Sequence, residues 1–292
     1  MPTPFAGSAA GAAPLDERSL ALRRSIVDAL AAAGQGHVGS SLSAVEILRV
    51  LYDDILRVNP NDPRWPDRDR FVFSKGHGCL ALYAILADKG FFAPALLHSV
   101  GTLDSPLGGH PESHAAPGVE FSTGALGHGL SVGTGMALAL RMQHRPARVF
   151  VLLGDGELDE GSVWEAALSA AHHRLDSLCV LVDRNRVQSY SDTERILGLE
   201  PLPDKWRSFG FAVTTVDGHD VAALRAALRQ AAATMGRPSA VICHTIKGKG
   251  LPFAENSAFW HYRSGIDEQQ VSLMRAALAT GSRSAEIGSQ NK

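Results

Sequence analysis

The chain has 292 residues, of which 45% are hydrophobic, and carries a formal net charge of −2. A chain of this length can bury a full core, and because no linker separates two regimes of composition we expect one domain. The nearly balanced charge, without a basic stripe, argues against nucleic acid and anionic membrane surfaces as partners. No segment reaches the roughly 18 continuous apolar residues of a membrane span.

The cysteines indicate the cellular compartment, and the composition of the two ends of the chain indicates the limits of the folded domain. There are three cysteines: Cys79, Cys179 and Cys243. An odd number among mostly apolar neighbours indicates buried, reduced thiols and a cytoplasmic protein. Residues 1–14 are rich in Ala, Gly and Pro without a basic region, which predicts a flexible leader rather than a signal peptide. The polar residues 279–292 predict a disordered tail, which leaves 15–278 as the domain.

Apolar periodicity and turn residues divide the chain into alternating helices and strands. Helices are predicted over 15–33, 44–55, 79–89, 130–142, 162–173 and 221–235, and strands over 70–73, 149–153, 178–182, 211–216 and 239–244. The first helix begins at Asp16 and ends at Gly34, and the second is capped by Ser43 with Glu46 at the capping-box spacing. The alternation predicts an α/β fold, a doubly wound, mostly parallel sheet with helices on both faces.

Two polar clusters come directly after the strands 149–153 and 178–182. They are Gly154-Asp155-Gly156-Glu157 and Asp183-Arg184-Asn185-Arg186-Val187. Because ligands of open α/β sheets bind at the carboxyl ends of strands, we expect both clusters to face one site.

The donor atoms in these clusters suit a hard cation that holds a diphosphate. Asp155 offers a carboxylate, Asn185 an amide oxygen and Val187 a main-chain carbonyl, a set that fits Mg²⁺, or Ca²⁺ or Mn²⁺. Gly154 and Gly156 let the backbone approach a phosphate, and the helix that follows presents its N-terminus to the anion. Each cluster alone is also an ordinary turn, but the pair across one strand–helix–strand unit favours a cofactor site.

The helix predicted over 162–173 is apolar or small around most of its circumference. A helix of this kind is buried, and its alanines allow another helix to come close. Two interpretations stay open, a central helix in the core of one chain or a helix at a subunit interface.

These clusters belong to a series of motifs that resembles the transketolase family. In chain order the motifs are Gly36–Ser43, Ser74–Gly78, Gly109–Glu112, Ser122–Gly129, Gly154–Glu157 with Trp164-Glu165-Ala166 and Asn185, and His244–Gly250 with Trp260-His261. The resemblance covers roughly residues 15–278 and fits best the N-terminal, diphosphate-binding subunit of a split, two-chain transketolase. It implies the thiamin diphosphate-binding fold, with this chain as its diphosphate-binding (PP) domain.

The resemblance implies thiamine diphosphate as cofactor, with the metal ion on Asp155, Asn185 and Val187. It implies cofactor contacts by His77, Gly124, Leu126, Gly127, Gly154, Gly156, Glu157, Asn185 and His261. Within this set the glycine loop at 124–127 would hold the aminopyrimidine ring, whereas His77 and His261 would contact the diphosphate.

The resemblance also assigns residues to the substrate. His37, His110 and His261 would line the substrate channel, where an imidazole with a pKa near 6.5 can move protons near neutrality. Glu160 would link two active sites across a dimer. Two interpretations of Lys247 stay open: it faces the substrate, or it is a solvated charge in a loop.

Some positions depart from the family pattern. Tyr190 stands where relatives often have glycine, which puts the loop shape and the contact near Ser189 in doubt. Tyr262 follows His261 in place of a glycine, which could narrow the channel or change the donor. His128 replaces a more usual polar residue of the glycine loop.

The half of the family that activates the cofactor has no counterpart in this sequence. In this enzyme class a glutamate on a pyrimidine-binding domain drives cofactor activation, and the sugar-phosphate ligands lie there too. We therefore expect a separate C-terminal subunit, within an α₂β₂ heterotetramer, and no catalysis by this chain alone. The implied reaction transfers a two-carbon ketol unit from a ketose phosphate to an aldose phosphate.

Three alternatives remain at this point: one chain of a decarboxylase or acyloin synthase, a deoxyxylulose-phosphate synthase, and a non-catalytic regulatory half. The loops at 109–112 and 122–129 argue against the first two, and intact Asp155 and Asn185 argue against the third. The sequence names neither the donor and acceptor nor the pathway.

Overall fold

The computed structural model describes residues 14–289, so the leader predicted over 1–14 lies outside the described residues except for Pro14. Between residues 14 and 289, no helix is both long and apolar enough to cross a membrane. All three cysteines are buried and free, as the sequence predicted.

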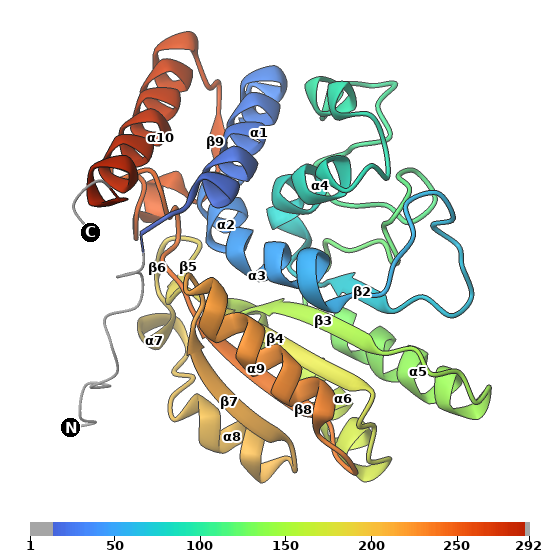
Figure 1. Ribbon diagram of the computed structural model, residues 1–292. Helices are drawn as coiled ribbons and strands as arrows, with labels where there is room; N and C mark the ends of the chain where they lie inside the picture. The colour runs from blue at the N-terminus through green and yellow to red at the C-terminus, as the bar shows by residue number, and fades with distance from the viewer. Residues whose placement is uncertain (1–13, 290–292) are drawn as a thin grey trace.

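A five-stranded parallel sheet forms the centre of the domain (Figure 1). Its strands are β2 (Arg70–Phe73), β3 (Val149–Gly154), β4 (Leu178–Arg184), β7 (Ala212–Asp217) and β8 (Ser239–His244). They lie in the order β2-β3-β4-β8-β7, and every neighbouring pair is parallel. The predicted parallel sheet is confirmed, and β4 runs two residues beyond the predicted end at Val182, so Arg184 lies within the strand.

Helices cover both faces of this sheet, because alternate strand residues point to two separate cores. Leu152 and Leu181 belong to the core formed with α1 (Glu17–Ala33), α2 (Val38–Ser43), α3 (Val45–Val50), α4 (Cys79–Asp88) and α9 (Val221–Ala233). Val151 and Val180 belong to the core formed with α5 (Gly129–Met142), α6 (Gly161–His172) and α8 (Leu202–Ser208). This two-sided burial confirms the doubly wound α/β fold (Figure 1).

The capping residues predicted from the sequence are correct for the first helix and wrong for the second. Asp16 caps α1 by accepting a hydrogen bond from the Ser19 amide at 2.9 Å, and Gly34 ends it with φ of 64°, as predicted. The capping box predicted at Ser43 and Glu46 is wrong. Ser43 is the last residue of α2, and its hydroxyl donates to Asp183 at 2.6 Å, far away in the sequence.

Because Ser43 does not cap a helix, the helix predicted over 44–55 differs in the structure and consists of two elements. α3 begins after Ala44, which makes no side-chain cap, and passes into a π-helical turn, η1 (Leu51–Ile55). The Glu46 carboxylate turns to buried partners on other elements instead of to its own helix terminus. Long-range ionic contacts in the core have overridden the local capping preference.

Several short elements were not predicted. They are α7 (Thr193–Ile196), the antiparallel pairs β1 (Gln35–Gly36) with β9 (Arg263–Ser264) and β5 (Val187–Gln188) with β6 (Ser191–Asp192), and the 3₁₀ turns η2 (Gly76–Gly78), η3 (Pro94–Ser99), η4 (Gly156–Asp159) and η5 (Ala258–Trp260). The pair β1–β9 matters for the site because it brings the segment after Gly36 beside the segment before Arg263.

The C-terminal helix also differs from the sequence expectation. α10 (Glu268–Ser289) packs Val271, Met274 and Leu278 into the core shared with α1. It continues as a helix to Ser289, where a disordered tail was predicted over 279–292, and residues 290–292 lie outside the described part.

Helix α6 is buried on one side only. Val163, Ala166, Ala167 and Ala170 face the sheet, whereas Leu168 is 59% exposed. The prediction of a helix buried all round is therefore wrong for the single chain, and so is the interpretation of α6 as a central core helix. The interpretation as an interface helix stays a prediction.

Candidate active site

A cavity of about 230 Å³ lies at the carboxyl ends of β3, β4 and β8, where the polar clusters were expected to meet. It is lined by His37, Ser40, Lys75, His77, Gly124, Leu126, Gly154, Asp155, Gly156, Glu157, Asn185, Val187, Gln188, Ser189, Lys247 and His261. Most of the predicted cofactor and metal residues are in this set, although they come from five separate stretches of sequence.

The three predicted metal ligands line the same cavity. The Asp155 carboxylate is 2% exposed and accepts hydrogen bonds from the Gly156 amide at 2.9 Å and the Arg186 amide at 2.5 Å. Burial raises its pKa above the usual value. The Asn185 amide oxygen accepts from the Val187 amide at 3.1 Å, which fixes the turn that carries the Val187 carbonyl.

This donor set fits a hard cation. It joins one carboxylate, one amide oxygen and one carbonyl oxygen, and no group of three or more His, Cys, Asp or Glu side chains suited to a metal occurs among residues 14–289. Oxygen ligands that are few in number suit Mg²⁺, which completes its shell with phosphate oxygens and water.

Arg184 is a residue of the site that the sequence analysis missed. Its buried guanidinium donates to Asp155 at 3.2 Å, to the Thr193 hydroxyl at 2.6 Å and to Glu200 at 3.0 Å. It therefore holds the Asp155 carboxylate from behind the cavity. An arginine at the end of an apolar strand was the available signal, since such a charge needs buried partners.

Two lysines bring positive charge to the cavity. Lys75 is fully buried and donates to Asp183 and to the Ser40 carbonyl, the latter at 3.0 Å. Lys247 donates to the Val187 carbonyl at 2.7 Å, and burial lowers its pKa to about 8. The solvated interpretation of Lys247 is wrong, because the side chain is 2% exposed. Lys75 was not predicted, although it lies in the Ser74–Gly78 motif.

The predicted histidines converge from distant segments. The ring centre of His37 lies 5.2 Å from those of His77 and His261, and His77 and His261 lie 5.7 Å apart. Burial lowers the pKa of His37 to about 4 and that of His261 to about 3, so both rings are neutral at neutral pH. His110 lies at the rim, exposed, with its ring centre 6.3 Å from that of His37.

Two buried polar atoms at the cavity suit a polar ligand. His261 Nδ1 and Ser40 Oγ have no hydrogen-bond partner within residues 14–289. A buried polar atom without a partner is costly, so a bound group with complementary donors or acceptors would stabilise the site. Ser40 had not been singled out; it lies in the Gly36–Ser43 motif.

The glycine loop joins the cavity as predicted, through Gly124 and Leu126. Gly127 does not line it, and its amide donates to Glu157 at 3.0 Å. The Glu157 carboxylate also accepts from the Gly154 amide at 3.0 Å and from the Ser74 hydroxyl. In this structure Glu157 therefore ties the surrounding loops together.

Two further residues named in the sequence analysis do not line the cavity. Glu160 is exposed at the N-terminus of α6, and His128 is exposed at the N-terminus of α5. Neither lines the cavity, although the Glu160 side chain packs against Gly127 of the glycine loop, where an added Cβ atom would come within 2.6 Å of Glu160 Cβ.

The departures from the family pattern have clear structural positions. Ser189 and Tyr190 form the tip of the β5–β6 hairpin, where Ser189 has φ of 46° and Tyr190 is 90% exposed. Ser189 still lines the cavity. The Tyr262 ring lies 4.8 Å from the His37 ring, and its hydroxyl donates to the Gln35 side chain at 3.0 Å.

Known proteins resemble this chain over most of its length. The family model described as transketolase, thiamine diphosphate binding domain, matches residues 16–290. The chain belongs to the transketolase family. The 6-deoxy-6-sulfo-D-fructose transketolase subunit SqwG of Clostridium sp. (strain MSTE9) is 42% identical over 265 residues, which cover 91% of this chain and 95% of that protein.

Two further relatives show how the chain corresponds to the family. An apulose-4-phosphate transketolase subunit of Phocaeicola vulgatus is 42% identical over 253 residues, 87% of this chain and 90% of that protein. The solved transketolase from Leishmania mexicana has a TM-score of 0.82 at 30% identity, and the match covers 90% of this chain but 41% of that one.

The expected resemblance to the N-terminal subunit of a split transketolase is thereby confirmed, together with the thiamin diphosphate-binding fold. The names of these relatives support ketol transfer over the decarboxylase and deoxyxylulose-phosphate synthase alternatives. The roles of single site residues stay predictions.

Proposed function

We propose that the chain is the metal- and diphosphate-binding half of a two-subunit transketolase that uses thiamine diphosphate and Mg²⁺. The observation that supports this most is one cavity in which Asp155, Asn185 and the Val187 carbonyl meet two lysines and three histidines. Bound thiamine diphosphate supplies the nucleophilic carbon and the electron sink for carbon–carbon cleavage.

The residues of this chain divide the work of binding. Asp155, Asn185 and the Val187 carbonyl hold the cation, and Arg184 keeps the Asp155 carboxylate in place. Lys247 places a positive charge beside the diphosphate, which a dry site makes more effective than in water. Lys75 forms an ion pair with the buried Asp183 carboxylate and so balances its negative charge.

The histidines serve both the diphosphate and the substrate in this proposal. A neutral ring has one N–H donor and one acceptor, so His77 and His261 can donate to phosphate oxygens. His37, His261 and His110 face the side from which a ketose enters, and exchange protons with its hydroxyl and carbonyl oxygens. Gly124 and Leu126 hold the aminopyrimidine ring.

The donor in this proposal is a ketose with an anionic end, and the acceptor is an aldose phosphate. The support comes from two relatives named for a sulfonated fructose and for apulose 4-phosphate. The groups that grip the anionic end would come from the second subunit.

We further propose an α₂β₂ assembly in the cytoplasm. The relatives named as subunits support a partner chain, and the three free, buried cysteines support a reducing compartment. Glu160, at the surface end of α6, would reach the second active site across the interface between two copies of this chain.

The test is reconstitution. The purified chain is mixed with a separate C-terminal transketolase subunit, thiamine diphosphate and Mg²⁺, and transfer from a ketose phosphate to an aldose phosphate is measured. We expect activity in the mixture alone. The Asp155→Ala variant should lower it by about 100-fold or more, because the cation loses its one carboxylate ligand.

The matched control is Asp204→Ala, which removes an exposed carboxylate on α8 and should leave activity unchanged. Activity of this chain after removal of all partner protein would contradict the two-subunit proposal. Full activity of Asp155→Ala would contradict the metal assignment.

A further inference from the structure

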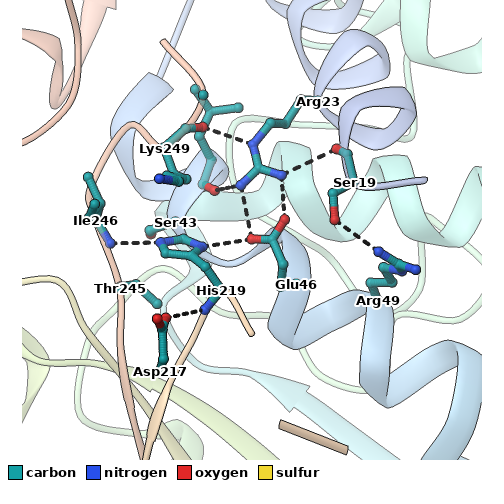
Figure 2. Close-up of polar contacts among 12 residues, drawn as sticks. Ser19, Arg23, Ser43, Glu46, Arg49, Asp217, His219, Thr245, Ile246 and Lys249 are labelled. Carbon is teal, nitrogen blue, oxygen red and sulfur yellow. Dashed lines mark hydrogen bonds and ion pairs between the residues drawn. The ribbon is translucent and has the colours of Figure 1, made fainter. Parts of the chain in front are cut away.

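A buried charged cluster contacts the segment 246–249 and is not used by the proposed chemistry. It consists of Arg23 on α1, Glu46 on α3 and His219 in the turn after β7, which are 0%, 1% and 3% exposed (Figure 2). Arg23 binds both carboxylate oxygens of Glu46, at 2.5 and 2.9 Å, and His219 Nδ1 lies 2.8 Å from the same carboxylate.

The hydrogen bonds define the state of His219. The Ile246 amide donates to His219 Nε2 at 2.8 Å, so this nitrogen carries no proton. Nδ1 is then the protonated nitrogen and donates to Glu46. The Asp217 carboxylate accepts from the His219 amide at 2.9 Å, which fixes the turn that carries the ring.

Arg23 extends the cluster to the other side of the same segment. Its Nε donates to the Lys249 carbonyl at 2.8 Å, and the remaining N–H groups donate to the Ser19 and Leu42 carbonyls at 3.3 and 3.2 Å. Every guanidinium donor is therefore used. Figure 2 shows Ile246 bound through His219 and Lys249 bound through Arg23, with Glu46 between the two side chains.

Lys247 lies between these two attachment points. Its side chain passes so close to α2 that a Cβ atom on Gly39 would come within 2.8 Å of Lys247 Cγ. The Gly248 amide donates to the Gly39 carbonyl at 3.1 Å, and Lys247 Nζ reaches the Val187 carbonyl. A small shift of the backbone at Ile246 or Lys249 would move the ammonium group away from the cavity.

We propose that Arg23, Glu46 and His219 are positioning residues that hold the segment 246–249 so that Lys247 faces the cofactor cavity. A buried ion pair seldom adds net stability over an apolar replacement, whereas its directional bonds fix geometry. The cluster joins three elements to one loop through such bonds. The consequence for the cofactor rests on the proposed function, but the hold on the segment does not.

Two substitutions at His219 separate its two bonds. His219→Gln places an amide oxygen near the position of Nε2 and can still accept from the Ile246 amide. His219→Asn places an amide nitrogen near the position of Nδ1 and can still donate to Glu46, but it leaves the Ile246 amide without an acceptor. Each variant removes one bond and the aromatic ring, so both lose the packing of the ring. The control is His144→Asn at an exposed position.

Two measurements decide the question, the first on the full-length chain and the second on the chain assembled with its C-terminal subunit. Hydrogen exchange of a peptide that covers 245–257 reports the hold on the segment, and calorimetry with thiamine diphosphate and Mg²⁺ reports affinity well below the unfolding temperature. We expect His219→Asn to exchange faster there and to bind about tenfold more weakly, since a buried amide loses its partner. His219→Gln should stay within about threefold of the unchanged chain, and His144→Asn should match it.

An affinity of His219→Asn equal to that of the unchanged chain, or unchanged exchange in His219→Asn, would overturn the proposal. Failure of the assembled complex with the unchanged chain to bind thiamine diphosphate would instead count against the proposed function. The exchange comparison between the two variants would still decide whether His219 holds the segment.

Discussion

His37, His77 and His261 meet in one cavity although long stretches of sequence separate them, and their surroundings set their chemistry. Burial is the largest cause of the low pKa of each, and the positive charges of Lys75 and Lys247 act in the same direction. A neutral imidazole beside buried ammonium groups keeps both a donor and an acceptor. The site is therefore prepared for an anion whose oxygens accept hydrogen bonds.

The low histidine pKa values predict how stability depends on pH without cofactor. An unfolded histidine titrates near 6.5, whereas His37 and His261 titrate at about 4 and about 3 in the folded chain. Above pH 6.5 neither state binds the proton. Below it the unfolded state binds protons that the folded state does not, so the free energy of unfolding falls until the pH reaches the folded values.

We expect His37→Gln to lose less stability than the unchanged chain when the pH is lowered. The difference in the free energy of unfolding should be up to about 1 kcal/mol per pH unit after allowance for solvent screening. Urea unfolding of both chains at pH 7 and pH 5 measures it. Glutamine does not titrate, so equal losses of stability in the variant and the unchanged chain would contradict the burial of a neutral ring at position 37.

At the scale of elements, the cavity depends on how closely α5 lies against the sheet. A Cβ atom on Gly133 would come within 2.4 Å of the Val151 side chain on β3, whereas one on Gly135, two residues along, would meet nothing within 4 Å. The helix thus rests on β3 through a residue without a side chain. Because Gly124–Leu126 lead into α5 and Gly154 ends β3, this packing sets the width between two walls of the cavity.

Alanine at these two glycines should have opposite effects. Gly133→Ala overpacks the α5–β3 contact and should lower the free energy of unfolding by about 1–3 kcal/mol. Gly135→Ala gains helix propensity without a clash and should raise it by up to about 1 kcal/mol. Thermal and urea unfolding of the single chain provide the comparison. Stabilisation by both substitutions would show that α5 leaves room above β3 for a side chain at position 133.

At the scale of the whole molecule, the chain leaves an apolar side chain on the exposed side of α6. Leu168 of α6 is 59% exposed, and α5 beside it ends in Met142, which is 73% exposed. Glu160, which does not line the cavity, is the N-cap residue of the same helix. These positions fit an interface between copies of this chain, which would bury Leu168 and bring Glu160 near a second site.

The interface predicts that Leu168→Glu weakens self-association while the fold is kept. Sedimentation velocity should show a smaller species for the variant, since a carboxylate would be buried without a partner. Met235→Glu, at an exposed methionine beyond the end of α9, is the control and should sediment like the unchanged chain. A Leu168→Glu variant that associates normally would place the interface elsewhere.

The sequence by itself determined those features that depend on neighbours in the chain. The strands β3 and β4 follow from apolar runs, α1 begins and ends at Asp16 and Gly34, and the polar clusters fall at strand ends. From parallel strands alone it follows that Asp155 and Asn185 share one edge. Family resemblance added the histidines, which no local pattern could have assigned.

The tertiary structure alone decided which side chains meet. Ser43 left its expected cap for Asp183, Glu46 turned to Arg23 and His219, and Glu157 bound loops from two other segments. The reason is physical. A cap or a turn is fixed by residues within one helical turn of each other, whereas the partners of a buried charge can lie anywhere in the sequence. An unpaired charge in the core costs more free energy than a local capping preference contributes, so the long-range pairing prevails.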